Sequence, residues 1–142
     1  MPSQMRLEFP FLSIGKLADS YEAGKSVEGE FFDSWDRVER FYEMQRVLPR
    51  DPILRFIGDL RRAGYDRAFR AGQSLVTLIL SRSRRHGLRP DQPCIRLEFS
   101  FNVSELAGTL RIGTEENSFM SAVALSAELS AALAKLAECP ID

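Results

Sequence analysis

The sequence predicts a single-domain α+β protein with a small antiparallel sheet of about three strands and helices packed on one face. Strand patterns near both ends of the chain predict the sheet, and helical periodicity covers most of the remainder. The chain has 142 residues, of which 44% are hydrophobic, which is enough for one core of ordinary size. We therefore expect residues 1–142 to form one globular domain.

Three segments carry the alternation of apolar and polar residues that is typical of a half-buried strand. The first spans residues 5–11, where Pro10 confines it to an edge or to a strand end. The second spans residues 94–101, and residues 109–112 follow a loop to form an antiparallel hairpin with it. Because residues 6–11 and 96–101 are almost identical, we interpret them as two strands of one sheet with a shared pattern.

Helical spacing of apolar residues predicts three helices. The first covers residues 33–48, with Asp33 or Ser34 as its cap and Pro49 after its end. The second begins at Asp51, has Pro52 at its first helical position and stops at Gly64. The third covers residues 118–138, is rich in alanine and is capped by Thr114 or Ser118.

Residues 74–86 are ambiguous between helix and strand. Their β-branched content is typical of a buried strand, whereas Ser74 would be a good helix cap and Gly87 a good helix terminator. Several basic side chains before Gly87 would also complement the negative end of a helix dipole. The sequence favours a mostly buried helix here, with a strand as the alternative.

The charge of the chain is strongly uneven along its length. Between Arg50 and Arg96 there are eleven arginines against four aspartates, a net +7, while the whole chain has a formal net charge of −1. Such a concentration of positive charge attracts phosphates or acidic proteins. The segment therefore makes polyanion binding an alternative function, although it contains no recognisable nucleic-acid-binding module.

Two groups of residues within this segment are candidate anion sites. Guanidinium groups recognise phosphates through bidentate contacts, and a helix starting at Ser74 would add free backbone amides. The alternative is a solvated helix end beside a glycine-containing turn, since the spacing of a nucleotide-binding P-loop is missing. The candidate residues are Arg67, Arg70 and Ser74 in one group, and Arg82, Arg84, Arg85 and Arg89 in the other.

No catalytic, metal-binding or cofactor-binding pattern stands out. His86 is the one histidine, which excludes sites with several histidines, and a helix from Ser74 would place it roughly 18 Å from that residue. The cysteines Cys94 and Cys139 form no CxxC pair and are expected to be reduced thiols. We expect no cofactor, no metal and no enzymatic activity; the enzyme alternative is acid–base chemistry on an anionic substrate.

By elimination, the sequence favours a small, bacterial-type cytoplasmic protein that acts by binding another protein or itself. No secretory signal is visible, and the apolar runs are too short for a membrane helix. Self-association is expected to use the alanine-rich C-terminal helix or the edge of the sheet. The partner would be a protein or a second copy, with a nucleic acid or an acidic protein as the alternative.

Overall fold

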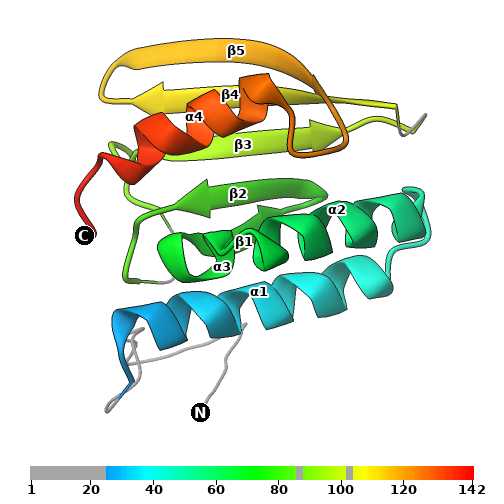
Figure 1. Cartoon of the computed structure of the whole chain (residues 1–142), viewed down its shortest axis with the longest axis horizontal. Coiled ribbons are helices and arrows are strands. Elements are labelled where there is room, and N and C mark those ends of the chain that lie inside the picture. Colours follow the sequence, from blue (N-terminus) through cyan, green and yellow to red (C-terminus); the bar gives the residue numbers. More distant parts are fainter. Residues whose placement is uncertain (1–24, 86–87, 102–103) are drawn as a thin grey trace.

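The computed structural model describes residues 25–85, 88–101 and 104–142. In this part of the chain, a helical region is followed by a sheet of successive hairpins and then by a last helix (Figure 1). The elements are α1 (Val27–Glu43), α2 (Arg50–Arg62), α3 (Tyr65–Ala68), β1 (Arg70–Ser74), β2 (Thr77–Ser81), β3 (Cys94–Phe99), β4 (Glu105–Ile112), β5 (Glu115–Ala122) and α4 (Ala127–Ala137).

The first two predicted helices are present, with shifted boundaries. Helix α1 begins earlier than predicted because Ser26, not Asp33 or Ser34, is its cap and accepts a hydrogen bond from the amide of Gly29 at 3.0 Å. Helix α2 begins at Arg50, and Gly64 follows it with a φ of 93°. That left-handed conformation suits glycine and explains why the helix stops there.

The prediction of a helix over residues 74–86 is wrong. Residues 70–74 and 77–81 form the hairpin β1–β2 around Leu75 and Val76. Strand β2 also pairs with β3 at four positions, from Leu78 with Leu97 to Ser81 with Cys94. Pairing on both sides satisfies the backbone of this β-branched segment, so the tertiary context outweighs the helix signals of Ser74 and Gly87.

The predicted helix over residues 118–138 is wrong in its first part. Gly113 has a φ of 64° and turns the chain, so that all eight residues of β5 pair with β4. Helix α4 begins only after Ser126, whose side chain accepts a hydrogen bond from the amide of Leu129 at 3.1 Å. The alanine-rich part of the prediction is helical, and the part before it is a strand.

The α+β class is confirmed, but the sheet has five strands rather than about three. Its order is β1-β2-β3-β4-β5, and every neighbouring pair is antiparallel. The predicted strand at residues 94–101 is β3, and the one at 109–112 is the second half of β4. The predicted strand at residues 5–11 lies outside the described residues.

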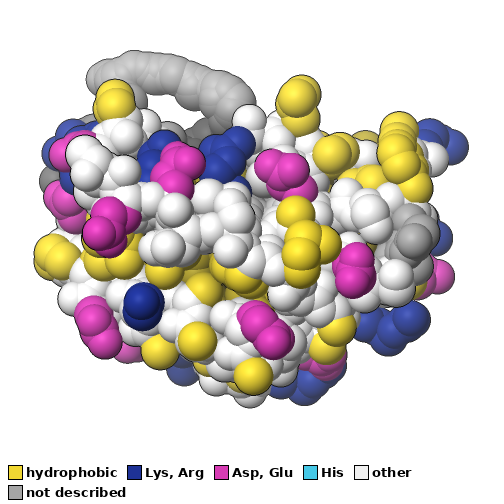
Figure 2. Space-filling model, turned by 90° about the horizontal axis from the view of Figure 1, so that it is seen from above, with side chains coloured by type: hydrophobic (Ala, Val, Ile, Leu, Met, Phe, Trp, Pro, Cys, Tyr) yellow, Lys and Arg dark blue, Asp and Glu magenta, His cyan; other side chains and the backbone are white. Residues whose placement is uncertain are grey.

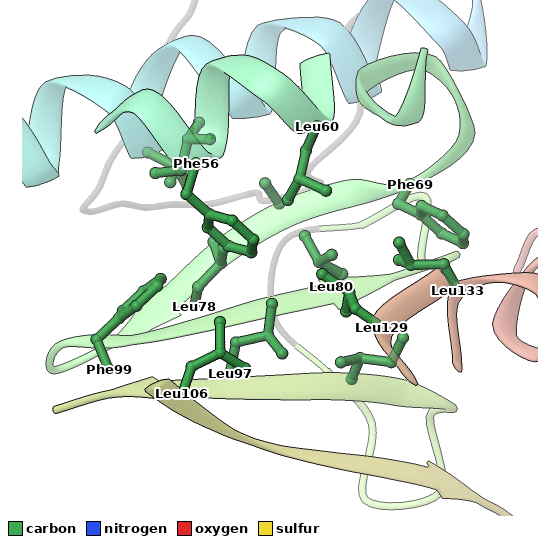
Figure 3. Packing of buried hydrophobic residues seen from close by; sticks show 14 of the residues in the cluster. Phe56, Leu60, Phe69, Leu78, Leu80, Leu97, Phe99, Leu106, Leu129 and Leu133 are labelled. Atoms are coloured by element: carbon green, nitrogen blue, oxygen red, sulfur yellow. The ribbon is translucent and has the colours of Figure 1, made fainter. Parts of the chain in front are cut away.

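One face of the sheet carries the hydrophobic core, and α1, α2 and α4 complete it (Figure 3). Register places Leu80, Ile95 and Leu110 in one row across the strands, and all three are buried. Phe56 of α2 reaches Phe99 of β3, with ring centroids 5.8 Å apart. The opposite face is open to solvent along β5, where the side chains of this face are exposed, and partly open along β4.

No helix in the described part of the chain combines the length and the apolar character that crossing a membrane requires.

Candidate interaction surface and the arginine network

The alternating strand directions place two kinds of surface at opposite ends of the sheet. In an antiparallel sheet of successive strands, β1, β3 and β5 end on one side and β2 and β4 end on the other. Helix α1 ends on the same side as β1, because the hydroxyl of Tyr42 donates a hydrogen bond to the carbonyl of Val76 at 2.9 Å. Figure 1 shows the connections that follow α1, β1, β3 and β5 at its right-hand end.

We call the first of these surfaces the apolar end. Large hydrophobic side chains from separate connections are exposed there. Figure 2 shows yellow side chains at this right-hand end, and others lie across the rest of that face. Single exposed hydrophobic residues are ordinary on a protein surface, but a group at one end indicates a contact surface. The residues of the apolar end, with their exposed fractions, are Met44 at 79%, Val47 at 64%, Leu75 at 87%, Phe101 at 72% and Leu125 at 37%.

Leu75 at the tip of the β1–β2 hairpin adds a backbone observation. It has a φ of 53°, and it is the non-glycine residue with a positive φ in the described part of the chain. A left-handed leucine costs roughly 1–2 kcal/mol, and hairpin turns of this kind normally use glycine or asparagine. Because the side chain is also exposed, it recovers little of that cost by packing within the monomer.

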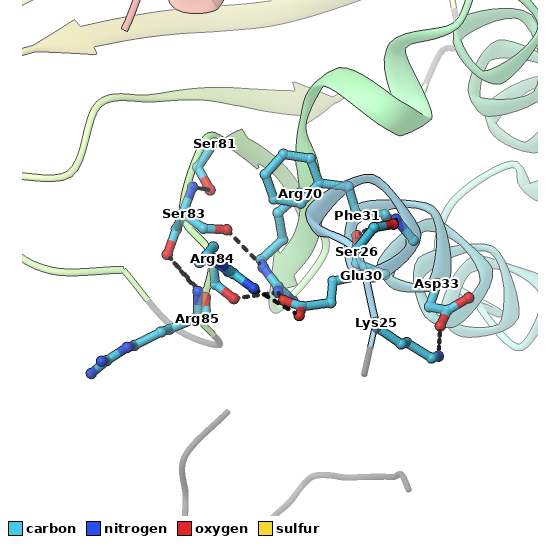
Figure 4. Close-up of polar contacts among 12 residues, drawn as sticks. Lys25, Ser26, Glu30, Phe31, Asp33, Arg70, Ser81, Ser83, Arg84 and Arg85 are labelled. Atoms are coloured by element: carbon cyan, nitrogen blue, oxygen red, sulfur yellow. Dashed lines mark hydrogen bonds and ion pairs between the residues drawn. The ribbon is translucent and has the colours of Figure 1, made fainter. Parts of the chain in front are cut away.

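At the opposite end, Glu30, Arg70 and Arg84 form what we call the arginine network (Figure 4). Glu30 lies in the first turn of α1 with its side chain 2% exposed, and its carboxylate lies 3.6 Å from Arg70 and 3.4 Å from Arg84. Arg70 also donates to the carbonyls of Ser83 at 2.9 Å and of Arg84 at 2.6 Å. The position that an external anion would take between these two guanidinium groups therefore holds the protein's own carboxylate.

Other arginines of the same end join the C-terminal residues to the sheet. Arg82 donates to the carbonyls of Cys139 and Ala68, each at 3.0 Å. Arg89 forms ion pairs with Asp91 and Asp142. The Arg89 guanidinium lowers the pKa of the Asp142 carboxyl, and these two carboxylates raise the pKa of Arg89.

Arg61 forms a separate cluster between α1, α2 and α3. Its guanidinium lies 2.8 Å from both Asp36 and Glu39, 3.0 Å from Asp66 and 4.5 Å from the centre of the Phe32 ring. Burial lowers the pKa of Arg61, but the hydrogen bonds to Asp36 and Asp66 and the neighbouring negative charges outweigh burial and raise it. This arginine holds helices together and has little capacity left for an external anion.

The predicted anion-site residues are only partly brought together. Arg70 and Arg84 meet at Glu30 in the arginine network, and Arg82 instead binds the carbonyls of Ala68 and Cys139. Ser74 ends β1 at the other end of the strand, about 13 Å from Arg70 at 3.3 Å per residue. Since Ser74 does not start a helix, the helix N-terminus expected to bind an anion there is not formed. Arg67 lies over Phe32, and Arg85 and Arg89 are exposed. His86 lies outside the described residues.

The cysteines do not form a chemical site among the described residues. Cys94 is fully buried, and burial raises its pKa despite the opposing effect of Arg111 and Arg96, so the thiol form is favoured. Cys139 is partly exposed near the end of α4. Residues 25–85, 88–101 and 104–142 contain no group of three or more histidine, cysteine, aspartate or glutamate residues able to hold a metal.

The apolar end is the surface that sequence reasoning missed. Alternation assigned Phe101 to the same face as Phe99, but β3 ends at Phe99, and Phe101 is 72% exposed in the loop. Leu75 was assigned to a buried helix. No local signal marked Leu75 as exposed, because residues 75–80 form one mostly apolar run in the sequence and the turn within it is visible only in the structure. Comparison of the chain with protein-family models, curated proteins and solved structures gives no match.

Proposed function

We propose that this protein is a non-catalytic binding module that docks onto another protein through the apolar end. The observation that carries the proposal is Leu75, which combines a strained backbone with a side chain that is 87% exposed. Strain that brings no packing within the monomer is typical of a residue kept for contact with a partner. Met44, Val47, Phe101 and Leu125 extend the contact surface around it.

The charge distribution supports a protein partner more than a polyanion. Arginines at the other end are engaged with backbone carbonyls and with carboxylates from outside the arginine-rich segment, as Glu30 and Asp142 show. Binding to a nucleic acid or another polyanion remains a prediction from the sequence. Exposed side chains such as Arg85 would have to carry it, since Arg70 is buried.

Replacing Leu75 with glycine separates the backbone strain at this position from the contact that its side chain would make with a partner. We expect Leu75→Gly to raise the free energy of unfolding by about 1 kcal/mol, because glycine adopts a positive φ without strain. The same change should weaken partner binding at least about tenfold, since a large exposed side chain is removed from the contact. Urea unfolding measures the first effect.

The partner is found by capturing proteins on the wild-type chain and on Leu75→Gly, and it is then purified for titration against both. Met120→Ser serves as the matched control, because Met120 is also exposed, at 55%, but belongs to β5. Loss of binding with Leu75→Gly and retention with Met120→Ser supports the proposal. Equal affinity of the purified partner for the wild type and Leu75→Gly contradicts it.

A further inference from the structure

The two edges of the sheet differ in how their backbone groups are satisfied. At the β1 edge, the amide of Ala71 donates to the hydroxyl of Ser34 at 2.9 Å, and the indole of Trp35 donates to the carbonyl of Phe69 at 2.9 Å. Helix α1 therefore covers that edge. Figure 1 places β5 at the opposite, upper edge, with α4 in front of the sheet rather than above it.

The register shows which backbone groups of β5 point outward. The backbone amide of Ala71 points away from β2, toward Ser34. Arg70 and Gly72 therefore form the hydrogen-bonded pairs with β2, and the same alternation continues from strand to strand. Carried across β2, β3 and β4, it makes Ile112 with Glu115 a hydrogen-bonded pair, which agrees with the two-residue hairpin between them. The residues of β5 whose amides and carbonyls point outward are Glu116, Ser118, Met120 and Ala122.

Strand β5 lacks most of the features that block edge pairing. It contains neither proline nor lysine, and its eight residues pair with β4 without a bulge. The ring of Phe119 lies over Gly108, where a Cβ would come within 2.2 Å of the ring, and this contact holds the strand in register. The carbonyl of Ala122 accepts a hydrogen bond from the hydroxyl of Ser121 at 2.7 Å, and in the described part of the chain the other outward amides and carbonyls of β5 form no backbone hydrogen bond.

We propose that β5 pairs with β5 of a second copy of this chain, antiparallel around a twofold axis at Phe119. Residues that pair across two strands must point to the same face of the sheet. With the axis at Phe119, the amides and carbonyls of all four outward residues can form hydrogen bonds, because Glu116 lies opposite Ala122 and Ser118 opposite Met120. The result is a sheet that continues across both copies. Exposed side chains of the β5 side, seen in Figure 2, would be partly covered.

Charge supports a second copy in this orientation. Both acidic residues of β5, Glu115 and Glu116, lie at its start, and its other end is uncharged. Antiparallel pairing places Glu116 beside Ala122 of the second copy, and the two Glu116 side chains lie about 20 Å apart along the strands, at 3.3 Å per residue. Parallel pairing would instead place like charges side by side, which is destabilising.

The inference does not rest on the apolar end, which belongs to other connections, and the test keeps the two apart. The mass in solution is measured by light scattering from micromolar to submillimolar concentration for the wild type, Ser118→Pro, Ser118→Ala and Leu75→Gly. Proline removes an outward amide and leaves the pairing with β4 intact, whereas alanine keeps the amide. We expect the dimer dissociation constant to rise at least about tenfold for Ser118→Pro only.

A second pair of variants tests the register even if Ser118→Pro folds poorly. Ala122→Glu places a carboxylate opposite Glu116 of the second copy and also opposite Glu105 of its own β4, so urea unfolding is measured beside the dimer dissociation constant, which should rise several-fold. Adding Glu116→Lys should restore the dimer, because these positions lie far apart within one chain and meet only across the twofold axis. Circular dichroism of each variant checks that it is folded.

Three outcomes overturn the inference. They are a wild-type chain that stays monomeric at every concentration, a dimer equally stable in a folded Ser118→Pro variant, and an Ala122→Glu dimer that Glu116→Lys does not restore. A dimer that responds to Leu75→Gly instead would assign self-association to the apolar end. If Leu75→Gly loses partner binding while its β5 dimer stays intact, both proposals are supported.

Discussion

At the scale of single residues, Arg84 and Arg85 are neighbours with different environments. The sequence places both on one exposed basic surface, but in the structure Arg84 contacts the buried carboxylate of Glu30 at 3.4 Å while Arg85 is exposed. We expect Arg84→Glu to lower the free energy of unfolding by about 2 kcal/mol, because it places a carboxylate beside Glu30. Arg85→Glu, the matched control, should change it by less than about 0.5 kcal/mol.

Urea unfolding of the two variants measures this difference, and equal stability would show that the ion pair with Glu30 contributes nothing.

The same variants test polyanion binding. If oligonucleotides are retained at low salt, Arg85→Glu should weaken the retention without loss of stability, and a steep salt dependence should accompany it.

At the scale of elements, the β4–β5 hairpin depends on a glycine beneath an aromatic ring. A Cβ on Gly108 would lie 2.2 Å from the Phe119 ring, so Gly108→Ala must displace that ring. We expect a loss of roughly 1–3 kcal/mol in the free energy of unfolding, as for other overpacked sites. In the background of Phe119→Ala, the same glycine change should cost much less, and a double-mutant cycle by urea unfolding measures the coupling.

Elements differ in how far the sequence determines them. Alternation identified β3 and spacing identified α1 and α2, because each buries one face whose period is visible in the chain. Residues 74–81 and 118–122 were assigned to helices, because their local signals are mixed. Their strands are fixed by pairing, β2 with β3 across a long connection and β5 with β4 across the turn at Gly113, and the alternation within each segment does not show this pairing.

The candidate site is likewise only partly determined by local sequence patterns. The arginine-rich segment is evident in the sequence, but its role is not, because the partners of Arg61 and Arg84 come from the earlier helix α1. The apolar end is assembled from connections that are far apart in the chain. Its residues look like ordinary core residues until the positions of the turns are known.

At the scale of the whole molecule, the hydrophobic core is continuous from α1 to α4. It includes Trp35 in α1, Leu80 in β2 and Leu133 in α4, all fully buried. Ion pairs add to these links, since Arg89 joins the connection after β2 to Asp142. A core shared by all elements should unfold as one cooperative unit, as most single domains of this size do.

The single-domain prediction can be tested with this continuity. Trp35 is the one tryptophan of the chain and is 0% exposed, so its fluorescence reports on the helical side of the core, while far-ultraviolet circular dichroism reports on all the secondary structure. We expect the two signals to give the same midpoint and slope in urea. A control with Trp35→Phe should keep the circular dichroism transition cooperative. Fluorescence that changes at a lower urea concentration would show that α1 leaves the sheet first, and the chain would then contain two units.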